Sequence, residues 1–203
     1  MGRFSKERRD VYYRRAKQSK YRARSAFKLL QLDEEFGLLE GVKRAVDLCA
    51  APGSWSQVLS ERVGGSDGEG VVVSVDLQEI APIEGVHCLR GDITRYSTAR
   101  EIISLFGGEK ADVVISDGAP DVTGLHDMDI YMQGQLLLAA AAIGTQVLVK
   151  GGNFAAKVFR GGREMGFLYE KLRTLFDRVV VAKPRASRNS SMESFVVCMG
   201  FNV

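Results

Sequence analysis

Four charged residues could together support proton transfer or stabilise a developing negative charge. Lys157 lies within the otherwise apolar run Asn-Phe-Ala-Ala-Lys-Val-Phe, where a lysine is unusual without a partner. Asp117, in Ser-Asp-Gly-Ala-Pro, ends a predicted strand and could pair with that cation. Glu193 begins another predicted strand, and Lys28 lies on the first predicted helix. Each residue alone also fits an edge charge or a surface salt bridge, so a chemical role requires that the four meet.

Residues 47–55, Asp-Leu-Cys-Ala-Ala-Pro-Gly-Ser-Trp, join the first predicted strand to the next helix. In an open α/β sheet, ligands bind at the carboxyl ends of the strands. Gly53 lets the backbone approach a ligand closely, and the free N–H groups at the start of a helix favour a carboxylate. The Gly-x-Gly-x-x-Gly spacing typical of dinucleotide binding is missing from this loop. A smaller ligand with a carboxylate, such as the methionine part of S-adenosylmethionine, is therefore favoured over an ordinary turn.

Two acidic residues follow at the ends of the next two predicted strands. Asp76 stands where a carboxylate can accept both ribose hydroxyls of a nucleoside. Asp92, in Arg-Gly-Asp, could accept the amino group of adenine. Either residue alone also fits a helix cap or a surface charge. Ligand-type residues at successive strand ends together predict a cofactor site.

The residues after the fourth predicted strand narrow the range of reactions that the protein could catalyse. Enzymes that methylate base amino groups usually carry Asp/Asn/Ser-Pro-Pro-Tyr/Phe there, and Ser-Asp-Gly-Ala-Pro has neither its stacking aromatic residue nor its polar acceptor. A cytosine-C5 enzyme needs a nucleophilic cysteine, usually after proline, and none of the three cysteines follows one. A nicotinamide-dependent dehydrogenase is disfavoured by the missing glycine pattern.

Alternating strands and helices would place these residues along one edge of a sheet. The first helix is predicted over residues 25–36, with Ser25 as its cap. Strands are predicted over residues 45–50, 71–77, 86–89, 111–116, 153–159, 178–182 and 194–199, and further helices over 54–63, 98–106, 132–150 and 164–175. This order predicts an α/β, Rossmann-like methyltransferase fold with a seven-stranded, mostly parallel sheet and helices on both faces. Because no helix separates the last two strands, we expect an antiparallel hairpin at one edge.

Charge is unevenly distributed along the chain. The net charge is +3, yet residues 1–24 hold ten Lys or Arg against two acidic residues, a net +8, which leaves −5 for the remainder. A basic arm on a mildly acidic body suggests a polyanionic partner, and aromatic residues in the arm could stack on unpaired bases. A solvated basic tail is the alternative. We expect a basic RNA-binding arm over residues 1–24 and a methyltransferase domain over residues 25–203.

Length and composition exclude other classes of protein. A chain of 203 residues fits one domain, and no apolar run approaches the roughly 18 residues that a membrane span needs. The N-terminus lacks the apolar region of a secretory signal. The three cysteines, odd in number and far apart, indicate reduced structural thiols rather than disulfides or a metal site. We therefore expect a cytoplasmic protein with no membrane or metal partner.

Four longer segments add a more specific signal. They are Tyr-Arg-Ala-Arg-Ser-Ala-Phe-Lys-Leu-Leu, Asp-Leu-Cys-Ala-Ala-Pro-Gly-Ser-Trp-Ser-Gln, Ser-Asp-Gly-Ala-Pro-Asp-Val-Thr-Gly-Leu-His-Asp and Ser-Arg-Asn-Ser-Ser-Met-Glu. Through them the chain resembles the FtsJ-like RNA 2'-O-methyltransferases, and within that group the eukaryotic tRNA anticodon-loop ribose methyltransferases. The family's Lys-Asp-Lys-Glu tetrad corresponds to Lys28, Asp117, Lys157 and Glu193. Its cofactor-binding residues correspond to Gly53, Trp55, Asp76, Asp92 and Asp117.

The resemblance implies methyl transfer from S-adenosylmethionine to the ribose 2'-hydroxyl of two tRNA nucleotides, the wobble nucleotide and the first of the anticodon loop. It also implies accessory proteins that choose between these targets. A relative acting on ribosomal RNA or on an mRNA cap would use the same tetrad, so that alternative stays open, whereas a non-catalytic RNA-binding module would not need it. Lys157 is the family's base, but a lysine with the ordinary pKa of about 10.4 is protonated, so a role as a cationic clamp also stays open.

Overall fold

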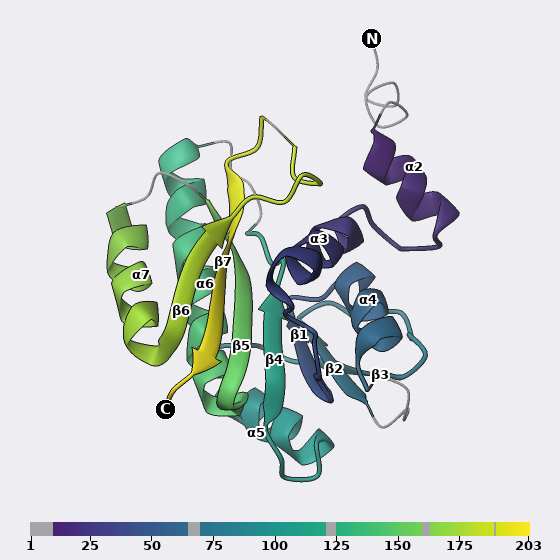
Figure 1. The fold of residues 1–203 in the computed structure, drawn as a ribbon, viewed down its shortest axis with the longest axis vertical. Helices are drawn as coiled ribbons and strands as arrows, with labels where there is room; N and C mark the ends of the chain where they lie inside the picture. The colour runs from purple at the N-terminus through teal and green to yellow at the C-terminus, as the bar shows by residue number, and fades with distance from the viewer. Residues whose placement is uncertain (1–9, 65–69, 121–124, 160–162, 189) are drawn as a thin grey trace.

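A seven-stranded sheet forms the centre of the molecule, in the strand order β3-β2-β1-β4-β5-β7-β6 (Figure 1). The structure is a computed structural model that describes residues 10–64, 70–120, 125–159, 163–188 and 190–203. The strands are β1 (Arg44–Leu48), β2 (Val71–Asp76), β3 (Val86–Arg90), β4 (Ala111–Ser116), β5 (Leu148–Phe159), β6 (Phe176–Ala182) and β7 (Glu193–Phe201). β1 to β5 pair in parallel, while β7 is antiparallel to both β5 and β6. The predicted fold class and the edge hairpin are confirmed.

Helices cover both faces of this sheet. They are α2 (Val11–Gln18), α3 (Ala26–Phe36), α4 (Ser54–Arg62), α5 (Tyr96–Leu105), α6 (His126–Val147) and α7 (Arg163–Leu175). α5, α6 and α7 bury apolar residues of one face, and α3 and α4 bury those of the other. The first helix places Ala26, Leu29 and Leu32 in the core and leaves Phe36 partly buried, as its spacing predicts.

Three predicted boundaries of the long helix and the fifth strand are wrong. α6 begins at His126 rather than at residue 132 and ends at Val147 rather than at residue 150, and β5 begins at Leu148 rather than at residue 153. The apolar run around residue 148 does not distinguish helix from strand by periodicity. Pairing decides it, because Leu148 lies opposite Ala111 before a register shift near Val113.

The basic arm contains a helix that its charge pattern did not predict. Asp10 precedes α2 and accepts hydrogen bonds from the backbone N–H groups of Tyr12 and Tyr13, which caps the helix. The predicted cap of the next helix is wrong. Ser25 has an α-helical backbone and makes no capping bond, and its hydroxyl instead meets the Ser54 hydroxyl at 2.6 Å. Residues 1–9 of the arm lie outside the described residues.

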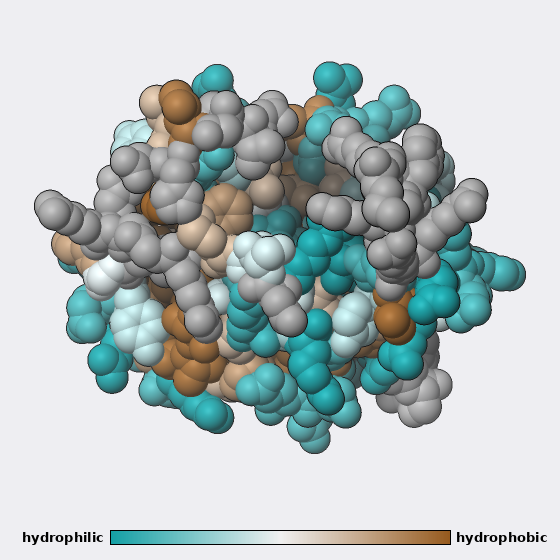
Figure 2. Space-filling model, turned by 90° about the horizontal axis from the view of Figure 1, so that it is seen from above, coloured by the Kyte–Doolittle hydropathy of each residue, from teal (hydrophilic) through white to brown (hydrophobic). Residues whose placement is uncertain are grey.

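Hydrophilic and apolar side chains gather on different sides of the upper surface (Figure 2). Hydrophilic residues dominate the side of α2, α3 and α4, and exposed apolar residues gather toward α6 and α7, including Tyr131, Leu138 and Phe167. Cys198 is buried as expected of a structural thiol, whereas Cys88 is exposed on β3. None of the described helices has the length and apolar character to cross a membrane.

Candidate active site

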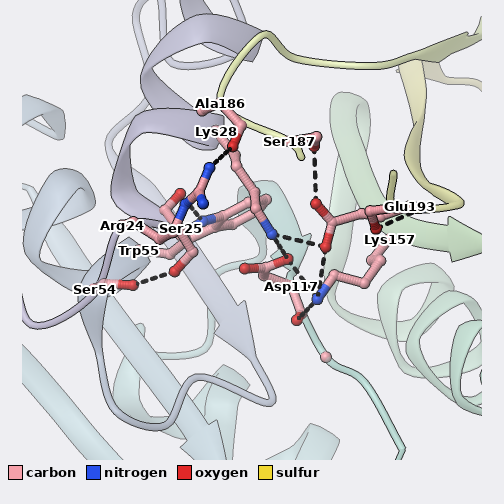
Figure 3. Close-up of polar contacts among 12 residues, drawn as sticks. Arg24, Ser25, Lys28, Ser54, Trp55, Asp117, Lys157, Ala186, Ser187 and Glu193 are labelled. Carbon is pink, nitrogen blue, oxygen red and sulfur yellow. Dashed lines mark hydrogen bonds and ion pairs between the residues drawn. The ribbon is translucent and has the colours of Figure 1, made fainter. Parts of the chain in front are cut away.

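The four charged residues singled out by the sequence meet at the carboxyl ends of β4 and β5 (Figure 3). Lys28 Nζ lies 2.8 Å from Glu193 Oε2 and 3.4 Å from Asp117 Oδ1. Lys157 Nζ lies 2.8 Å from Asp117 Oδ1 and 3.5 Å from Glu193 Oε2. The side chains therefore form a ring in which cations and carboxylates alternate, which we call the charged ring.

Burial makes this arrangement depend on its own pairing. Lys28 and Lys157 are each 8% exposed, and an unpaired charge at such a site would carry a large desolvation cost. Two positive and two negative side chains give the ring no net formal charge. The Lys28 ammonium also lies 5.6 Å from the centre of the Phe195 ring, in cation–π contact.

Glu193 is held as an acceptor by its neighbours. Its burial opposes ionisation, but the charges of Lys28 and Lys157 and the hydrogen bond from Ser187 hold the pKa of Glu193 below its ordinary value. Its Oε1 accepts from the Ser187 hydroxyl at 2.8 Å, while Oε2 faces the two ammonium groups. The two oxygens of this carboxylate therefore have separate partners.

Backbone alternation and one glutamine fix Lys157. Its neighbours in β5, Ala156 and Val158, pack in the core under α6, so Lys157 points to the opposite face with Ala155. The buried Gln133 of α6 donates from Nε2 to the carbonyl oxygens of Gly118 and Lys157, at 3.2 and 3.0 Å. Lys157 Nζ in turn donates to the backbone oxygen of Asp117 at 2.7 Å.

The turn at Gly53 requires glycine for packing and conformational reasons that the sequence did not indicate. Gly53 has φ +101°, and a Cβ there would lie 2.7 Å from Ile83 Cδ1 and 2.8 Å from an Arg22 guanidinium nitrogen. That guanidinium donates to the carbonyl oxygens of Pro52, Ala81 and Pro82. Close packing against the 80–83 segment and Arg22, together with the backbone conformation, thus excludes a side chain.

A cavity of about 30 Å³ connects this turn to the charged ring. Its lining comprises Ser25, Asp47, Cys49, Ala50, Ala51, Ser54, Trp55 and Asp117. The Trp55 ring is 2% exposed, packs 5.5 Å from the Phe195 ring and donates from Nε1 to the Ser25 oxygen at 2.7 Å. Trp55 is thus a wall between α3, α4 and β7. A volume of this size holds about one water molecule.

The two acidic residues at the strand ends differ in their surroundings. Asp76 accepts from the N–H of Ala51, which lines the cavity, and from that of Gln78, at 2.9 and 2.8 Å. Asp92 does not line the cavity. It accepts from the N–H and hydroxyl of Thr94, and these hydrogen bonds are the main reason why the pKa of Asp92 is lowered.

Sequence reasoning missed Asp47, the buried acid that begins the loop predicted to bind a cofactor. Asp47 is 1% exposed and accepts from the Ser56 hydroxyl at 2.6 Å. Burial raises the pKa of Asp47 to about 7; the Ser56 hydrogen bond lowers it, and the charges of Asp117 and Asp76 raise it further. An acidic residue inside a buried strand, next to a candidate ligand loop, was the available signal.

A second, larger cavity lies away from these residues. It measures about 340 Å³ and runs between α6 and α7, lined mainly by apolar residues such as Leu137, Leu138, Val158 and Phe167. None of the predicted catalytic or cofactor residues lines it. Within the described part of the chain, no cluster of three or more His, Cys, Asp or Glu residues is placed to hold a metal ion.

Comparison with known proteins gives a consistent result. A family model described as FtsJ-like methyltransferase matches residues 21–201. The tRNA (cytidine(32)/guanosine(34)-2'-O)-methyltransferase of Mus musculus is 65% identical over 202 residues, which cover 100% of this chain and 62% of the relative. The enzyme of the same name from Schizosaccharomyces pombe is 58% identical, over 100% of this chain and 73% of its own.

A solved structure shows the same architecture. A crystal structure from Plasmodium falciparum, described as that of a ribosomal RNA methyltransferase, superposes with a TM-score of 0.79 at 26% identity. The match covers 89% of this chain and 98% of the other. The present chain spans about three fifths of the length of several of its relatives, such as those of mouse and Homo sapiens, at 62% and 61%.

Proposed function

The chain belongs to the FtsJ-like methyltransferase family, and on that premise we propose that it methylates ribose 2'-hydroxyls in the anticodon loop of tRNA, using S-adenosylmethionine. The observation that carries this proposal is the charged ring, in which Lys28, Asp117, Lys157 and Glu193 converge from four separate elements. The names of the mouse and S. pombe relatives, which specify cytidine 32 and guanosine 34, support the choice of tRNA and of its two nucleotides.

The proposed reaction needs two contributions from the protein, alignment of the ribose hydroxyl and stabilisation of negative charge on its oxygen. Bound S-adenosylmethionine would supply a methyl group already activated by its sulfonium. The ring must then align a ribose hydroxyl in line with that methyl group and offset the negative charge that develops on the oxygen. Positioning is the larger contribution, because a weak nucleophile gains most from being held in the reactive geometry. The ring is suited to this, since each cation is braced by two carboxylates.

Lys157 is the residue that we assign to the hydroxyl. Its ammonium is held by Asp117 Oδ1 and by the Asp117 backbone oxygen, contacts that support a cation which stabilises the developing alkoxide. A neutral Lys157 would instead accept the hydroxyl proton as a general base. Lys157→Arg separates the two roles, because arginine keeps the charge and does not act as a base at neutral pH. Partial activity of Lys157→Arg supports the clamp, and complete loss with intact cofactor binding supports the base.

The residues at the other strand ends fit the proposed cofactor. α4 begins at Gly53 without a side-chain capping bond, so its first N–H groups can receive a carboxylate. Asp76 uses two acceptor positions on backbone N–H groups and keeps others for ribose hydroxyls. Asp92 would meet the adenine, and Trp55 and Asp117 would border the methionine part. Because the cavity is small, most of the bound S-adenosylmethionine would lie outside it, over the carboxyl ends of β1 and β2.

We assign tRNA contact to the basic arm, residues 1–24, and catalysis to residues 25–203. We also propose accessory proteins that choose between the two nucleotides, and a cytoplasmic location, which fractionation of cells would test.

The discriminating assay incubates the protein with labelled S-adenosylmethionine and purified tRNA, ribosomal RNA or capped transcripts, with and without cell extract. Label mapped to the anticodon loop supports the proposal, and label confined to ribosomal RNA or caps contradicts it.

Lys157→Ala tests the charged ring directly. We expect methyl transfer to fall below about one thousandth of the wild-type rate, because the group facing the hydroxyl is removed. Binding of S-adenosylmethionine, measured by calorimetry, should stay within about three-fold, because Lys157 does not line the cofactor cavity. Near-normal turnover of this variant would remove Lys157 from the reaction.

A further inference from the structure

Side chains from other parts of the protein hold the loop between β6 and β7 at the backbone of Ala186. The Ala186 N–H donates to Gln31 Oε1 at 2.8 Å. The Ala186 carbonyl oxygen accepts from the Arg24 guanidinium (Figure 3). Ala186 is 0% exposed, and Ser187 after it is 4% exposed. This loop therefore contains a buried anchor point with both of its backbone groups held by side chains.

The same two side chains also hold the helix of the basic arm. Gln31 Nε2 donates to the Tyr12 hydroxyl of α2 at 3.2 Å. Arg24 pairs with Asp10, the residue that caps α2. Each side chain that fixes Ala186 thus contacts α2 with its other polar atoms. A change in the position of α2 would reach the loop through these contacts and through Arg188 of the loop, whose Nε lies 3.9 Å from Asp10 Oδ2.

Ser187, the residue that follows the anchor point Ala186, contacts the charged ring. The Ser187 hydroxyl donates to Glu193 Oε1 at 2.8 Å, and Glu193 Oε2 faces Lys28 and Lys157. Ser187 therefore fixes the rotation of the Glu193 carboxylate, which decides which oxygen meets the cations. The loop is also closed on itself, because Lys183 Nζ donates to the Ser191 carbonyl oxygen at 2.6 Å.

The outer surface of α2 is suited to a polyanion. Arg14, Arg15 and Lys17 are exposed there, within two turns of the helix. Phosphates held by these side chains would fix α2 against α3, and Gln31 and Arg24 would then hold Ala186 more firmly. The chain of contacts runs without a gap from the basic helix α2 to a carboxylate of the charged ring.

We propose that Gln31 and Arg24 are positioning residues that couple RNA bound on α2 to the orientation of Glu193. The proposal rests on the proposed function, since it needs RNA as the ligand of the arm. In this arrangement the charged ring reaches its full catalytic geometry when the arm is occupied. RNA that contacts the ring alone is methylated slowly, which makes the arm a determinant of kcat as well as of affinity.

Gln31→Met and Gln31→Glu form a matched pair for the test. Methionine keeps the length of the side chain and loses both hydrogen bonds. Glutamate keeps the acceptor for the Ala186 N–H, and the Tyr12 hydroxyl can donate to it. With tRNA as substrate, we expect kcat to fall about ten-fold or more in Gln31→Met, with the KM for S-adenosylmethionine unchanged, and to recover to within about three-fold of wild type in Gln31→Glu. Gln146→Met, on the far end of α6, is the control.

Amide hydrogen exchange supplies a readout besides activity. Adding tRNA should slow exchange across residues 183–188 in the wild type and in Gln31→Glu, but not in Gln31→Met. Tyr12→Phe removes only the hydrogen bond between Gln31 and α2. Its effect on kcat should vanish in a Gln31→Met background, as expected for coupled residues.

Equal losses in Gln31→Met and Gln31→Glu, or additive effects of Tyr12→Phe and Gln31→Met, would overturn the coupling. So would wild-type kcat in Gln31→Met. A wild-type protein that methylates no tRNA, even with cell extract, would instead contradict the proposed function itself.

Discussion

At the scale of single residues, the charged ring is a neutral set whose members stabilise one another. Removing Lys28 alone would leave the carboxylates of Asp117 and Glu193, both largely buried, to share the charge of Lys157. We expect Lys28→Met to lower the free energy of unfolding by about 3 kcal/mol, because a buried charge loses its partner. The double variant Lys28→Met/Glu193→Gln should regain part of that loss, since it restores neutrality and keeps an acceptor for Ser187. Urea denaturation measures both, and a double variant less stable than the single one would contradict this account.

Asp47 gives stability a pH dependence of its own. The pKa of Asp47 rises from about 3.8, its ordinary value, to about 7 in the folded protein because of burial. Between these values the folded carboxyl keeps a proton that the unfolded chain releases, so stability falls as pH rises from about 4 to about 7. Asp47→Asn cannot ionise and should flatten this part of the curve, leaving the variant more stable than wild type above pH 7 by a few kcal/mol. Parallel curves of urea midpoint against pH would show that Asp47 does not titrate in this range.

Residue chemistry was predictable where a side chain was out of place in its local pattern. Lys157 in an apolar strand and Asp117 at a strand end indicated the charged ring from the sequence alone. Ser187 and Gln31 gave no such signal, because polar residues in a loop and on a helix are ordinary. Their importance comes from tertiary contacts between positions far apart in the chain.

At the scale of elements, the join between β1 and α4 depends on Gly53. We expect Gly53→Ala to lower the free energy of unfolding by about 2 kcal/mol or more, because alanine combines an unfavourable positive φ with a collision against Ile83. Gly41→Ala is the matched control. Gly41 also has a positive φ, +70°, but nothing lies within 4 Å of a Cβ there. Denaturant midpoints compare the two, and equal losses would show that backbone strain alone decides the effect.

Element types and order followed from composition and periodicity, while element ends did not. β5 was predicted over its last seven residues only, since its start is defined by pairing with β4. α2 was missed because basic residues dominate its sequence and eight residues are too few to show a repeated apolar pattern. Its helical form depends on the Asp10 cap and on contacts with Tyr12 and Arg24.

At the scale of the whole molecule, residues 1–24 carry a net charge of +8 and the remainder of the chain a net charge of −5. We expect the triple variant Arg14→Ala/Arg15→Ala/Lys17→Ala to weaken tRNA binding and to reduce the slope of log Kd against log salt by about 2. The reason is that binding releases fewer counterions from the RNA when fewer phosphate contacts form. A control triple variant replaces three exposed cations away from α2 and the charged ring, namely Arg100, Lys110 and Lys150, with alanine. Fluorescence anisotropy at several salt concentrations measures both. Equal slopes for the two variants would show that α2 does not contact phosphates.

The place of β7 in the sheet has a consequence for how the protein is made in the cell. β7 comes after β6 in the chain yet lies between β5 and β6. Until a ribosome has released residues 193–201, two strands wait with unpaired edges, and the ring lacks Glu193. A product that ends before β7 would therefore lack Glu193 of the charged ring and would present exposed strand edges, a feature that favours aggregation and chaperone binding. The complete sheet and the complete charged ring therefore both depend on the same late segment, β7.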